Sequence, residues 1–469
     1  MASVPRLELE ASIAWKGWTR PGRTLEVDLQ LKAQSPQQAG IELRSGPATA
    51  RTRVTLAGGQ SQRLQLPLPA SEQVLVEVTP DQGPPVRQVL SANLSESPLL
   101  GLALADGRSF GLPGFKSVEL SAADLPRRAV AHDAIDALVI DAATLARLAP
   151  AQLTALLGHA AACGRIVVLQ AESRLRESLA AAGRCREPSF MLADTLADAE
   201  QALRRSLAQP ALRPPADGSV GDLLPPDPRL WRLLAALVAV YVALMLLAAT
   251  ITRRWPVFLL LPLTATAGLW LGLPALGPPA RLVVWSEAEA GSPTARYLAR
   301  QTVQGSARQP LHIQIPPLLG AAARSCDGVR PLVLEYDASG QTAQAAQVST
   351  RLFSRSALCF DGSFPVTRSL AVSDAGGAAP RLHNPGPAAW PAGRLIAQGQ
   401  VQALAPMAAA GATPVSATAG RAATDAVERL AQARTGVARW AALWPLDLDT
   451  VGALPAGARG WLLMTVAAP

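Results

Sequence analysis

The chain has 469 residues, of which 49% are hydrophobic and 17% are charged, and its mean hydropathy is +0.20. This hydrophobic content is high for a soluble protein, and the chain is long enough for about three domains. The net charge is +8, but the arginines are scattered without a run of five or six, so we expect no nucleic-acid partner.

Residues 1–92 are predicted to form an antiparallel β-sandwich. Apolar and polar residues alternate in four stretches: Leu7–Ile13, Leu25–Lys32, Leu64–Leu68 and Val74–Val78. This period of two, broken by turn residues such as Gly58-Gly59, is typical of strands with one buried face. The segment from Gly17 to Leu31 (GWTRPGRTLEVDLQL) resembles the opening strands of immunoglobulin-like domains in bacterial envelope proteins. The resemblance implies an immunoglobulin-like sandwich.

Residues 93–209 are predicted to form an α/β domain with a parallel sheet. The predicted strands are the apolar runs Leu99–Asp106, Ala137–Ile140, Arg165–Leu169 and Phe190–Ala193. Helical spacing covers Ala143–Cys163 and Leu196–Leu207. Apolar strands that alternate with helices indicate a parallel sheet covered on both faces.

The stretch from Asp136 to Leu169 resembles class I glutamine amidotransferase-like domains found in bacterial membrane proteins. Cys163-Gly164 stands where those domains carry a glycine pair. The catalytic form needs a cysteine on a strand-to-helix turn with a histidine and an acid downstream. Cys163 instead lies at the end of a predicted helix, before a strand, and no histidine lies between Cys185 and the hairpin predicted from residue 230. The resemblance therefore implies a degenerate, non-catalytic domain.

We expect no cofactor. No G-x-G-x-x-G follows the first predicted strand, and the chain has no Walker A motif. Asp106, Asp136 and Asp141 lie near strand ends, where we expect them to form turns and helix caps.

A proline-rich linker is predicted over residues 210–229, followed by a transmembrane helical hairpin over residues 230–276. The segments Leu233–Ile251 and Val257–Leu276 contain no Asp, Glu, Lys or Arg, and a bilayer core is crossed by roughly 20 apolar residues. The residues expected at the membrane interface are Trp231, Arg232, Arg253, Arg254 and Trp255.

The hairpin predicts a multi-pass protein of the bacterial inner (cytoplasmic) membrane, with the lipid bilayer as a partner and the soluble domains on one side. The first residues contain no apolar signal-peptide region. We nevertheless expect both flanking domains in the periplasm, on the interpretation that the true start lies upstream.

Residues 277–469 are predicted to form a mostly-β domain. The strand candidates are Arg281–Trp285, Leu311–Ile315, Pro331–Tyr336, Val348–Phe353 and Trp461–Val466. A short helix is expected over Thr424–Ala433, with Thr424 as its N-cap. The late tryptophans Trp390, Trp440, Trp444 and Trp461 suit core packing better than a carbohydrate platform.

The four cysteines are Cys163, Cys185, Cys326 and Cys359. Their spacing matches no metal site, so we expect no metal. Two lie on each side of the predicted hairpin, which suits one disulfide per flanking domain in an oxidising compartment, although four free thiols would leave the same pattern.

No catalytic set is apparent. His132-Asp133 resembles half of a proton relay, but no nucleophile motif accompanies it. We therefore predict a non-enzymatic, membrane-anchored envelope protein that acts in scaffolding, assembly or partner binding with other envelope proteins. Two alternatives stay open. One is a polysaccharide-binding or export accessory subunit, and the other is a hydrolase or amidotransferase that uses the α/β domain.

Overall fold

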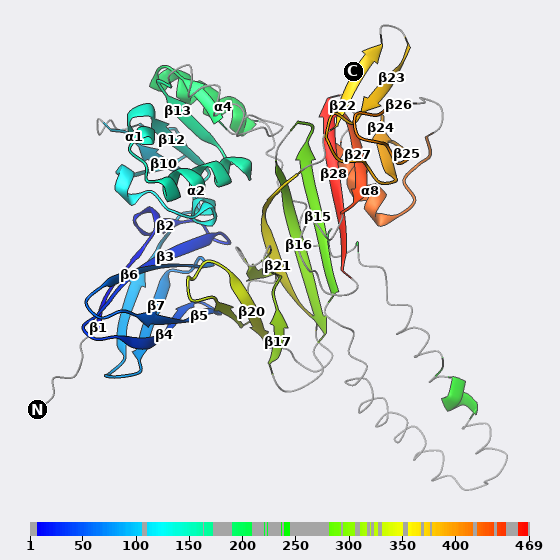
Figure 1. Ribbon diagram of the computed structural model, residues 1–469. Coiled ribbons are helices and arrows are strands. Elements are labelled where there is room, and N and C mark those ends of the chain that lie inside the picture. Colours follow the sequence, from blue (N-terminus) through cyan, green and yellow to red (C-terminus); the bar gives the residue numbers. More distant parts are fainter. Residues whose placement is uncertain are drawn as a thin grey trace, which may run out of the picture.

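The structure of the protein is a computed structural model. It describes residues 7–105, 110–162, 164–171, 190–208, 220, 223, 236, 239–243, 281–291, 294–304, 310–316, 319, 323–326, 331–349, 355–366, 370–375, 378–415, 420–435, 439–446 and 458–467. Most of these residues lie in β-strands, which form several sheets, one of them parallel (Figure 1). The predicted β-rich, multidomain fold with a parallel sheet is confirmed at this level.

The N-terminal part consists of two antiparallel sheets packed face to face. The first holds β1 (Leu7–Ile13), β3 (Thr24–Ala33) and β6 (Ser61–Pro69), and the second includes β4 (Gln37–Ser45), β5 (Ala48–Leu56), β7 (Gln73–Pro80) and β8 (Val86–Ser91). Because every second side chain of a strand points to the same face, the alternating apolar residues meet between the sheets. None of the following is more than 2% exposed: Leu25, Val27, Leu29, Leu31, Leu64, Leu66, Leu68, Val74, Val76 and Val78.

The second sheet of this sandwich continues into strands from the far end of the chain. These strands are β17 (Leu311–Gln314), β19 (Leu332–Tyr336) and β20 (Ala343–Val348). β19 pairs in parallel with β5, with Leu332 opposite Ala48, which gives a seven-stranded sheet. Strands from both sides of the predicted boundary at residue 277 therefore share one sheet.

The α/β part contains a five-stranded parallel sheet in the order β11-β10-β12-β13-β14. The strands are β10 (Leu99–Ala103), β11 (Lys116–Glu119), β12 (Ala137–Asp141), β13 (Ile166–Leu169) and β14 (Phe190–Ala193). The helical elements are η2 (Ala122–Asp124), η3 (Ala129–Ala134), α1 (Ala142–Ala146), α2 (Pro150–Ala161) and α4 (Leu196–Ala208). Elements η3, α1 and α2 pack on one face and α4 on the other (Figure 1). The central strands are therefore buried on both sides, which explains their continuous apolar runs.

One predicted helix of this domain is two helices in the structure. The expected helix over Ala143–Cys163 is interrupted, and α2 begins at Pro150. Proline lacks an amide hydrogen and suits the first turn of a helix rather than its interior. The short strand β11 was not anticipated, because its sequence KSVE carries little apolar signal.

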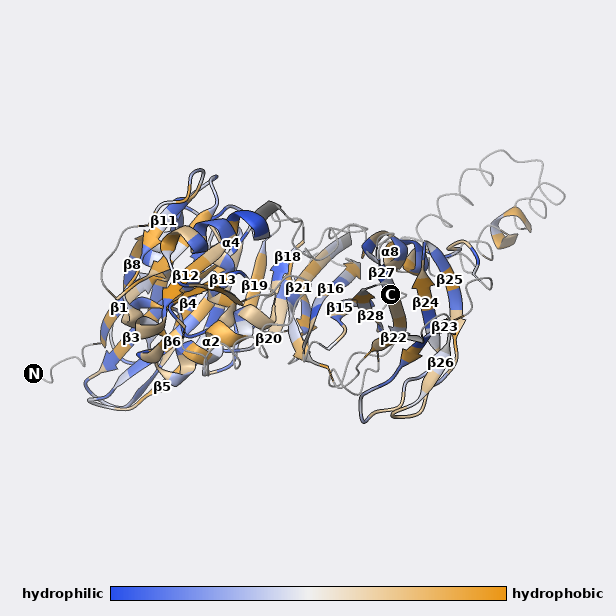
Figure 2. Cartoon of the chain, turned by 90° about the horizontal axis from the view of Figure 1, so that it is seen from above, coloured by the Kyte–Doolittle hydropathy of each residue, from blue (hydrophilic) through white to orange (hydrophobic). Residues whose placement is uncertain are grey.

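The C-terminal part is dominated by an eight-stranded sheet in the order β18-β21-β16-β15-β28-β27-β24-β25. Its strands are β15 (Arg281–Glu289), β16 (Thr294–Gln304), β18 (Ala323–Ser325), β21 (Arg355–Pro365), β24 (Gly393–Ala397), β25 (Gln400–Leu404), β27 (Arg439–Pro445) and β28 (Arg459–Ala467). A small sheet contains β22 (Ala371–Ala375), β23 (Ala378–His383) and β26 (Ala412–Pro414). Helix α8 (Ala426–Thr435) packs against β24 and β27. In Figure 2, much of α4 and part of α8 are coloured as hydrophilic residues.

One detail of the C-terminal predictions was wrong by one residue, and another lies mostly outside the described residues. Of the predicted strand Val348–Phe353, the structure describes only residues 348 and 349, and Val348 is the last residue of β20. The side chain of Asp425, not that of Thr424, accepts the amide hydrogen of Glu428 at the start of α8. Asp425 therefore caps the helix.

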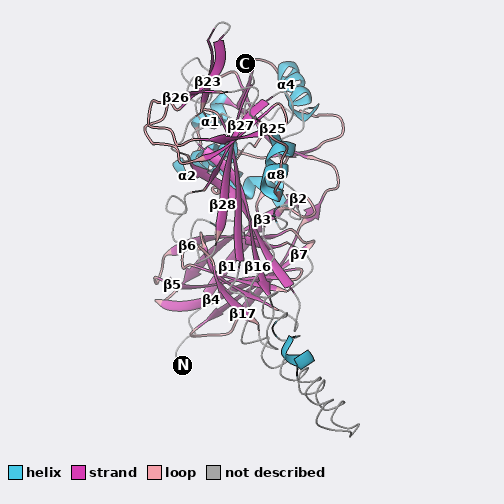
Figure 3. Cartoon of the chain, turned by 90° about the vertical axis from the view of Figure 1, so that its right-hand side faces the viewer, coloured by secondary structure: helices cyan, strands magenta, loops and turns pink. Residues whose placement is uncertain are grey.

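The predicted transmembrane hairpin needs correction. Among the described residues, no helix has both the length and the apolar character needed to cross a membrane. The longest described helix, α4, has 13 residues, whereas a span needs roughly 20. This finding contradicts the predicted hairpin, the membrane assignment and the inner-membrane localisation, and we withdraw all three. Figure 3 shows how few helices accompany the strands.

Most of the predicted hairpin lies outside the described residues. Within 230–276, the structure describes residue 236 and residues 239–243, and within the predicted linker it describes residues 220 and 223. The predicted interface residues Trp231, Arg232, Arg253, Arg254 and Trp255 all fall outside the described part.

Candidate functional site

The carboxyl ends of the parallel strands are where an open α/β sheet would bind a ligand. The order β11-β10-β12-β13-β14 reverses direction between β10 and β12, and ligands favour such a switch point. Asp141 ends β12 there. Its Oδ1 accepts the Thr144 amide hydrogen at 2.6 Å and its Oδ2 accepts that of Ala105 at 2.6 Å. Both carboxylate oxygens are thus engaged by the backbone, as expected for a strand-end cap.

The opposite end of the same domain packs against the sandwich, and Trp15 enters it there. The indole is 1% exposed and belongs to the core of the α/β domain. Its Nε1 donates a hydrogen bond to the carbonyl of Ala131 in η3 at 2.8 Å. Gly101 in β10 makes room for the ring, since a Cβ there would lie 2.6 Å from Trp15 Cζ3. Trp15 itself has a φ of 58°, a strained backbone for a bulky residue.

Two arginines of the sandwich hold two aspartates of the α/β domain. Arg23 donates to Asp133 at 3.0 Å and to Asp136 at 3.3 Å, and Arg20 donates to Asp136 at 2.8 Å. The Asp133 Oδ2 also accepts the amide hydrogen of Thr24 at 3.1 Å. Burial lowers the pKa of Arg23, but Asp133 and Asp136 outweigh it and raise that pKa. These pairs fix the register of η3 on β3.

Arg128, directly before η3, joins three parts of the chain. Its guanidinium donates to the carbonyls of Gln65 and Gly340 at 2.8 Å each, and to that of Gln341 at 2.7 Å. It also lies 3.7 Å from Glu26 in β3. Glu26 should face solvent by strand alternation, yet it is 1% exposed because η3 packs over β3. Burial raises the pKa of Glu26 to about 7, although Arg128 acts in the opposite direction.

A pair of histidines lies beside this contact. His132 of η3 and His159 of α2 stack with ring centroids 5.2 Å apart, and Trp15 meets His132 edge-on at 5.4 Å. Burial, followed by the charge of His159, lowers the pKa of His132 well below its usual range. Burial, Arg296 and Arg23 lower the pKa of His159 to about 4. The pair is therefore neutral at pH 7. Asp133 turns to Arg23, so His132-Asp133 does not form a relay.

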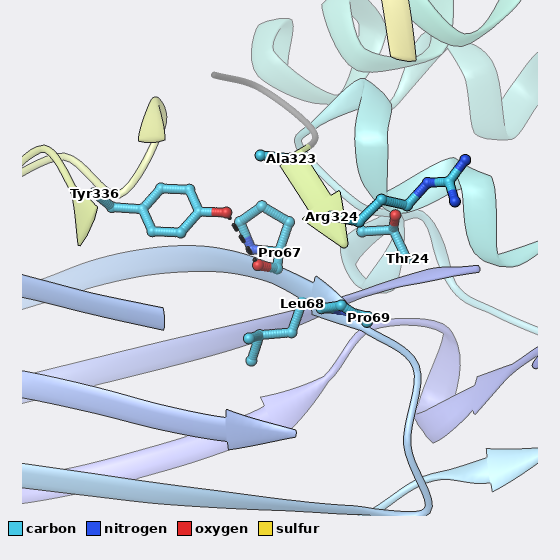
Figure 4. A pocket seen from close by; sticks show the side chains of 7 residues that line it. All are labelled: Thr24, Pro67, Leu68, Pro69, Ala323, Arg324 and Tyr336. Atoms are coloured by element: carbon cyan, nitrogen blue, oxygen red, sulfur yellow. Dashed lines mark hydrogen bonds between the residues drawn. The ribbon is translucent and has the colours of Figure 1, made fainter. Parts of the chain in front are cut away.

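The C-terminal sheet adds charges to the same region. Arg324 of β18 lies 3.6 Å from Asp361 of β21. Burial raises the pKa of Asp361, and the nearby Asp133 adds to that rise. A cavity between the sandwich and this sheet is lined by Thr24, Pro67, Leu68, Pro69, Ala323, Arg324 and Tyr336 (Figure 4). Its volume of about 10 Å³ holds roughly one water molecule. It is too small for an organic substrate.

We use the term junction for the contact between η3 and β3, with its charged residues Arg20, Arg23, Glu26, Arg128, Asp133 and Asp136. Single-sequence reasoning missed it, because each of these six residues has its junction partner more than 100 residues away in the sequence. The sequence offered one signal for the junction. Glu26 lies in a regular strand, on the face that alternation directs away from the core of the sandwich.

One nucleophile and base pair occurs in the described chain outside the junction. Ser373 of β22 and His383 of β23 approach to 2.5 Å between Oγ and Nε2. Local sequence spacing does not reveal this pair, because it forms only across two paired strands. Within the described residues no carboxylate is bonded to His383, so the third, orienting group of a catalytic triad is missing from that part.

The cysteines divide between described and undescribed residues. Cys326 and Cys359 form a disulfide, with a Cα–Cα distance of 5.1 Å, that joins the loop after β18 to β21. Cys163 and Cys185 lie outside the described residues. No group of three or more potential metal ligands occurs within the described ranges.

The late tryptophans are mostly core residues. Trp390 and Trp444 are 1% and 0% exposed and pack edge-to-face at 4.8 Å. Trp440 is also buried, and Trp461 is half-buried. Stacking on a sugar needs an exposed indole face, so these residues form no carbohydrate platform.

Comparison with known proteins identifies no family for this chain. No protein-family model matches the chain, and no curated protein matches it. Among solved structures, the chain is similar to a cycloisomaltooligosaccharide glucanotransferase from Paenibacillus sp. complexed with cycloisomaltoheptaose, at 17% identity. The match covers 28% of this chain and 20% of that one, with a TM-score of 0.17. A likeness of this size carries no argument about fold or function.

Proposed function

We propose that the chain is a non-enzymatic scaffolding protein that binds a protein partner through the fixed placement of its domains. The observation that carries this proposal is a set of charged side chains, partly or largely buried, that join different parts of the chain. Arg23 pairs with Asp133 and Asp136, and Arg128 donates to three carbonyls and pairs with Glu26, which makes six contacts with other parts of the same chain. Buried ion pairs and charged hydrogen bonds of this kind constrain geometry more than they add stability.

The α/β domain also supports a non-enzymatic role. Asp141, the acid at the switch point, caps α1 and holds the Ala105 amide, so it serves the fold rather than a ligand. We further propose that this domain is a degenerate relative of class I glutamine amidotransferase-like domains and that the N-terminal sandwich is immunoglobulin-like. The parallel strand order and the two packed antiparallel sheets are consistent with both proposals.

Affinity isolation of the full chain from the cells that produce it tests the scaffolding role. A specific partner should be recovered with the wild-type protein and depleted at least severalfold with Arg128→Met. The matched control is Arg53→Met, because Arg53 is 71% exposed and pairs only weakly with Asp81 at 3.7 Å. Equal recovery with both variants would show that domain placement does not matter for binding.

Purified protein should also be assayed for hydrolysis of glutamine and simple esters. Turnover that disappears in Ser373→Ala while the protein stays folded would replace the scaffolding proposal with an enzymatic one. Polysaccharide binding has no support from the tryptophans, since Trp390 and Trp444 are buried.

A further inference from the structure

We propose that the junction is a pH-sensitive latch, closed by a proton on Glu26 and opened by protons on His132 and His159. Opening here means separation of η3 and α2 from β3 and Trp15. The inference goes beyond the scaffolding role, because it adds a condition under which the fixed placement of the domains is released.

The first step is the position of the histidines. His132 and His159 stack on each other, and His132 meets Trp15 edge-on, at the surface where the α/β domain meets the sandwich. Among the described residues, neither imidazole is paired with a carboxylate. Two imidazolium rings 5.2 Å apart would repel each other, and burial would penalise both charges.

The second step is the set of charges around the pair. Arg23 precedes β3, and Arg296 comes from β16, and both disfavour a proton on His159. The other charged or titratable groups of this region are Arg20, Glu26, Arg128, Asp133, Asp136, Glu287, Arg324 and Asp361. The aspartates are already paired with arginines, so they contribute little electrostatic attraction that would favour protonated histidine rings.

The third step is the sign of each titration. The pKa of His159 is about 4 when the junction is closed, against 6.5 when the ring is exposed. Its contribution to closure is therefore complete above pH 6.5 and is lost as the pH falls through 4. His132 acts in the same direction. The pKa of Glu26 is about 7 when closed, against 4.5 when exposed. Its contribution is complete below pH 4.5 and is lost as the pH rises through 7.

The net effect follows from counting protons. Between pH 4.5 and 6.5, opening lets His159 take up a proton while Glu26 releases one, so these two contributions largely cancel. Proton uptake by His132 acts in the same direction as that by His159, so the opening equilibrium should rise as the pH falls. Glu26 thus damps the acid response without cancelling it.

Amide hydrogen exchange of the full chain, corrected for the intrinsic exchange rate, measures this slope. The reporter is η3, and the reference is β7, which lies on the far sheet of the sandwich. Wild-type protein should open more as the pH falls. Glu26→Gln should respond about tenfold more steeply per pH unit than wild type, because its proton release is removed. His132→Gln should show almost no dependence, because His159 and Glu26 then cancel, and His159→Gln should respond less steeply than wild type.

Two substitutions at exposed positions serve as controls. Glu10→Gln on β1 and His312→Gln on β17 replace the same residue types at exposed positions, and both should keep the wild-type slope. Four equal slopes in wild type, Glu26→Gln, His132→Gln and His159→Gln would overturn the latch. So would a steeper slope in either histidine variant. Each variant reports independently, so one that fails to fold leaves the others decisive.

Discussion

Gly101 of β10 is the position at which the smallest change should disturb the contact between the sandwich and the α/β domain. A Cβ there would lie 2.6 Å from Trp15 Cζ3, 3.1 Å from Leu138 Cδ1 and 3.2 Å from Ile135 Cδ1. The two aliphatic contacts can relax by a few tenths of an ångström. The indole cannot, because its Nε1 is held by the carbonyl of Ala131. Gly101→Ala should therefore destabilise the protein by about 1–3 kcal/mol through overpacking.

Removing the indole should reverse that penalty. Trp15→Ala alone should cost about 3–5 kcal/mol, the usual range for a fully buried tryptophan. In the Trp15→Ala background, the extra methyl group of Gly101→Ala enters the vacated space, so its own cost should fall close to zero. The double-mutant cycle should then give a coupling of about 1–3 kcal/mol, with the double variant more stable than the two single effects predict.

Urea unfolding followed by far-ultraviolet circular dichroism gives these free energies. Gly111→Ala is the matched control, because a Cβ at Gly111 meets nothing within 4 Å. It should change stability by less than about 0.5 kcal/mol. If the costs of Gly101→Ala and Trp15→Ala simply add, or if Gly101→Ala is as mild as the control, the Trp15 contact described above is wrong.

Three further predictions concern single interactions. Arg128→Met should lose about 2–4 kcal/mol of stability in urea unfolding, because three carbonyls lose a charged donor. Replacing Cys326 and Cys359 by serine should cost about 3–4 kcal/mol, given the 33-residue separation. Glu428→Gln should abolish the loss of thermal stability as the pH falls from 4.5 toward 2. The hydrogen bond from Arg421 is the foremost cause that lowers the pKa of Glu428 to about 2, so its stabilising contribution is present above pH 4.5 and disappears below 2.

Each of these three predictions would be contradicted by a specific result. An Arg128→Met protein as stable as wild type would mean that water satisfies the three carbonyls. An unchanged midpoint after serine replacement would mean that the disulfide does not restrain the unfolded chain. An acid transition identical in wild type and Glu428→Gln would assign the low-pH loss to other carboxylates.

The sequence predicted the parts of this fold that depend on local pattern. The alternation at Leu25, Val27 and Leu29 identified a strand and its buried face, and the apolar run at Ala137–Ile140 identified a strand covered on both sides. In a strand covered on one face every second side chain is buried, and in a strand covered on both faces every side chain is buried. Both patterns are visible in the local sequence.

The junction could not be predicted, because it depends on contacts between distant segments. Strand alternation places Glu26 on the solvent side, and only the docking of η3 buries it. Likewise, nothing local indicates that β19 would extend the sheet of β5, since the two strands are nearly 300 residues apart. The prediction of a membrane hairpin was wrong for another reason, because it relied only on local signals, namely apolar length, the absence of charged residues and flanking tryptophans and arginines.

The central claim is that the junction makes the sandwich and the α/β domain one structural unit at neutral pH. Native-state hydrogen exchange of wild-type protein and Arg23→Met at pH 7 tests it most directly, with β3 and β12 as reporters. Arg23→Met removes the pairs with Asp133 and Asp136. Equal losses of protection in β3 and β12 are the predicted result. A loss in β12 with β3 unchanged would contradict the claim.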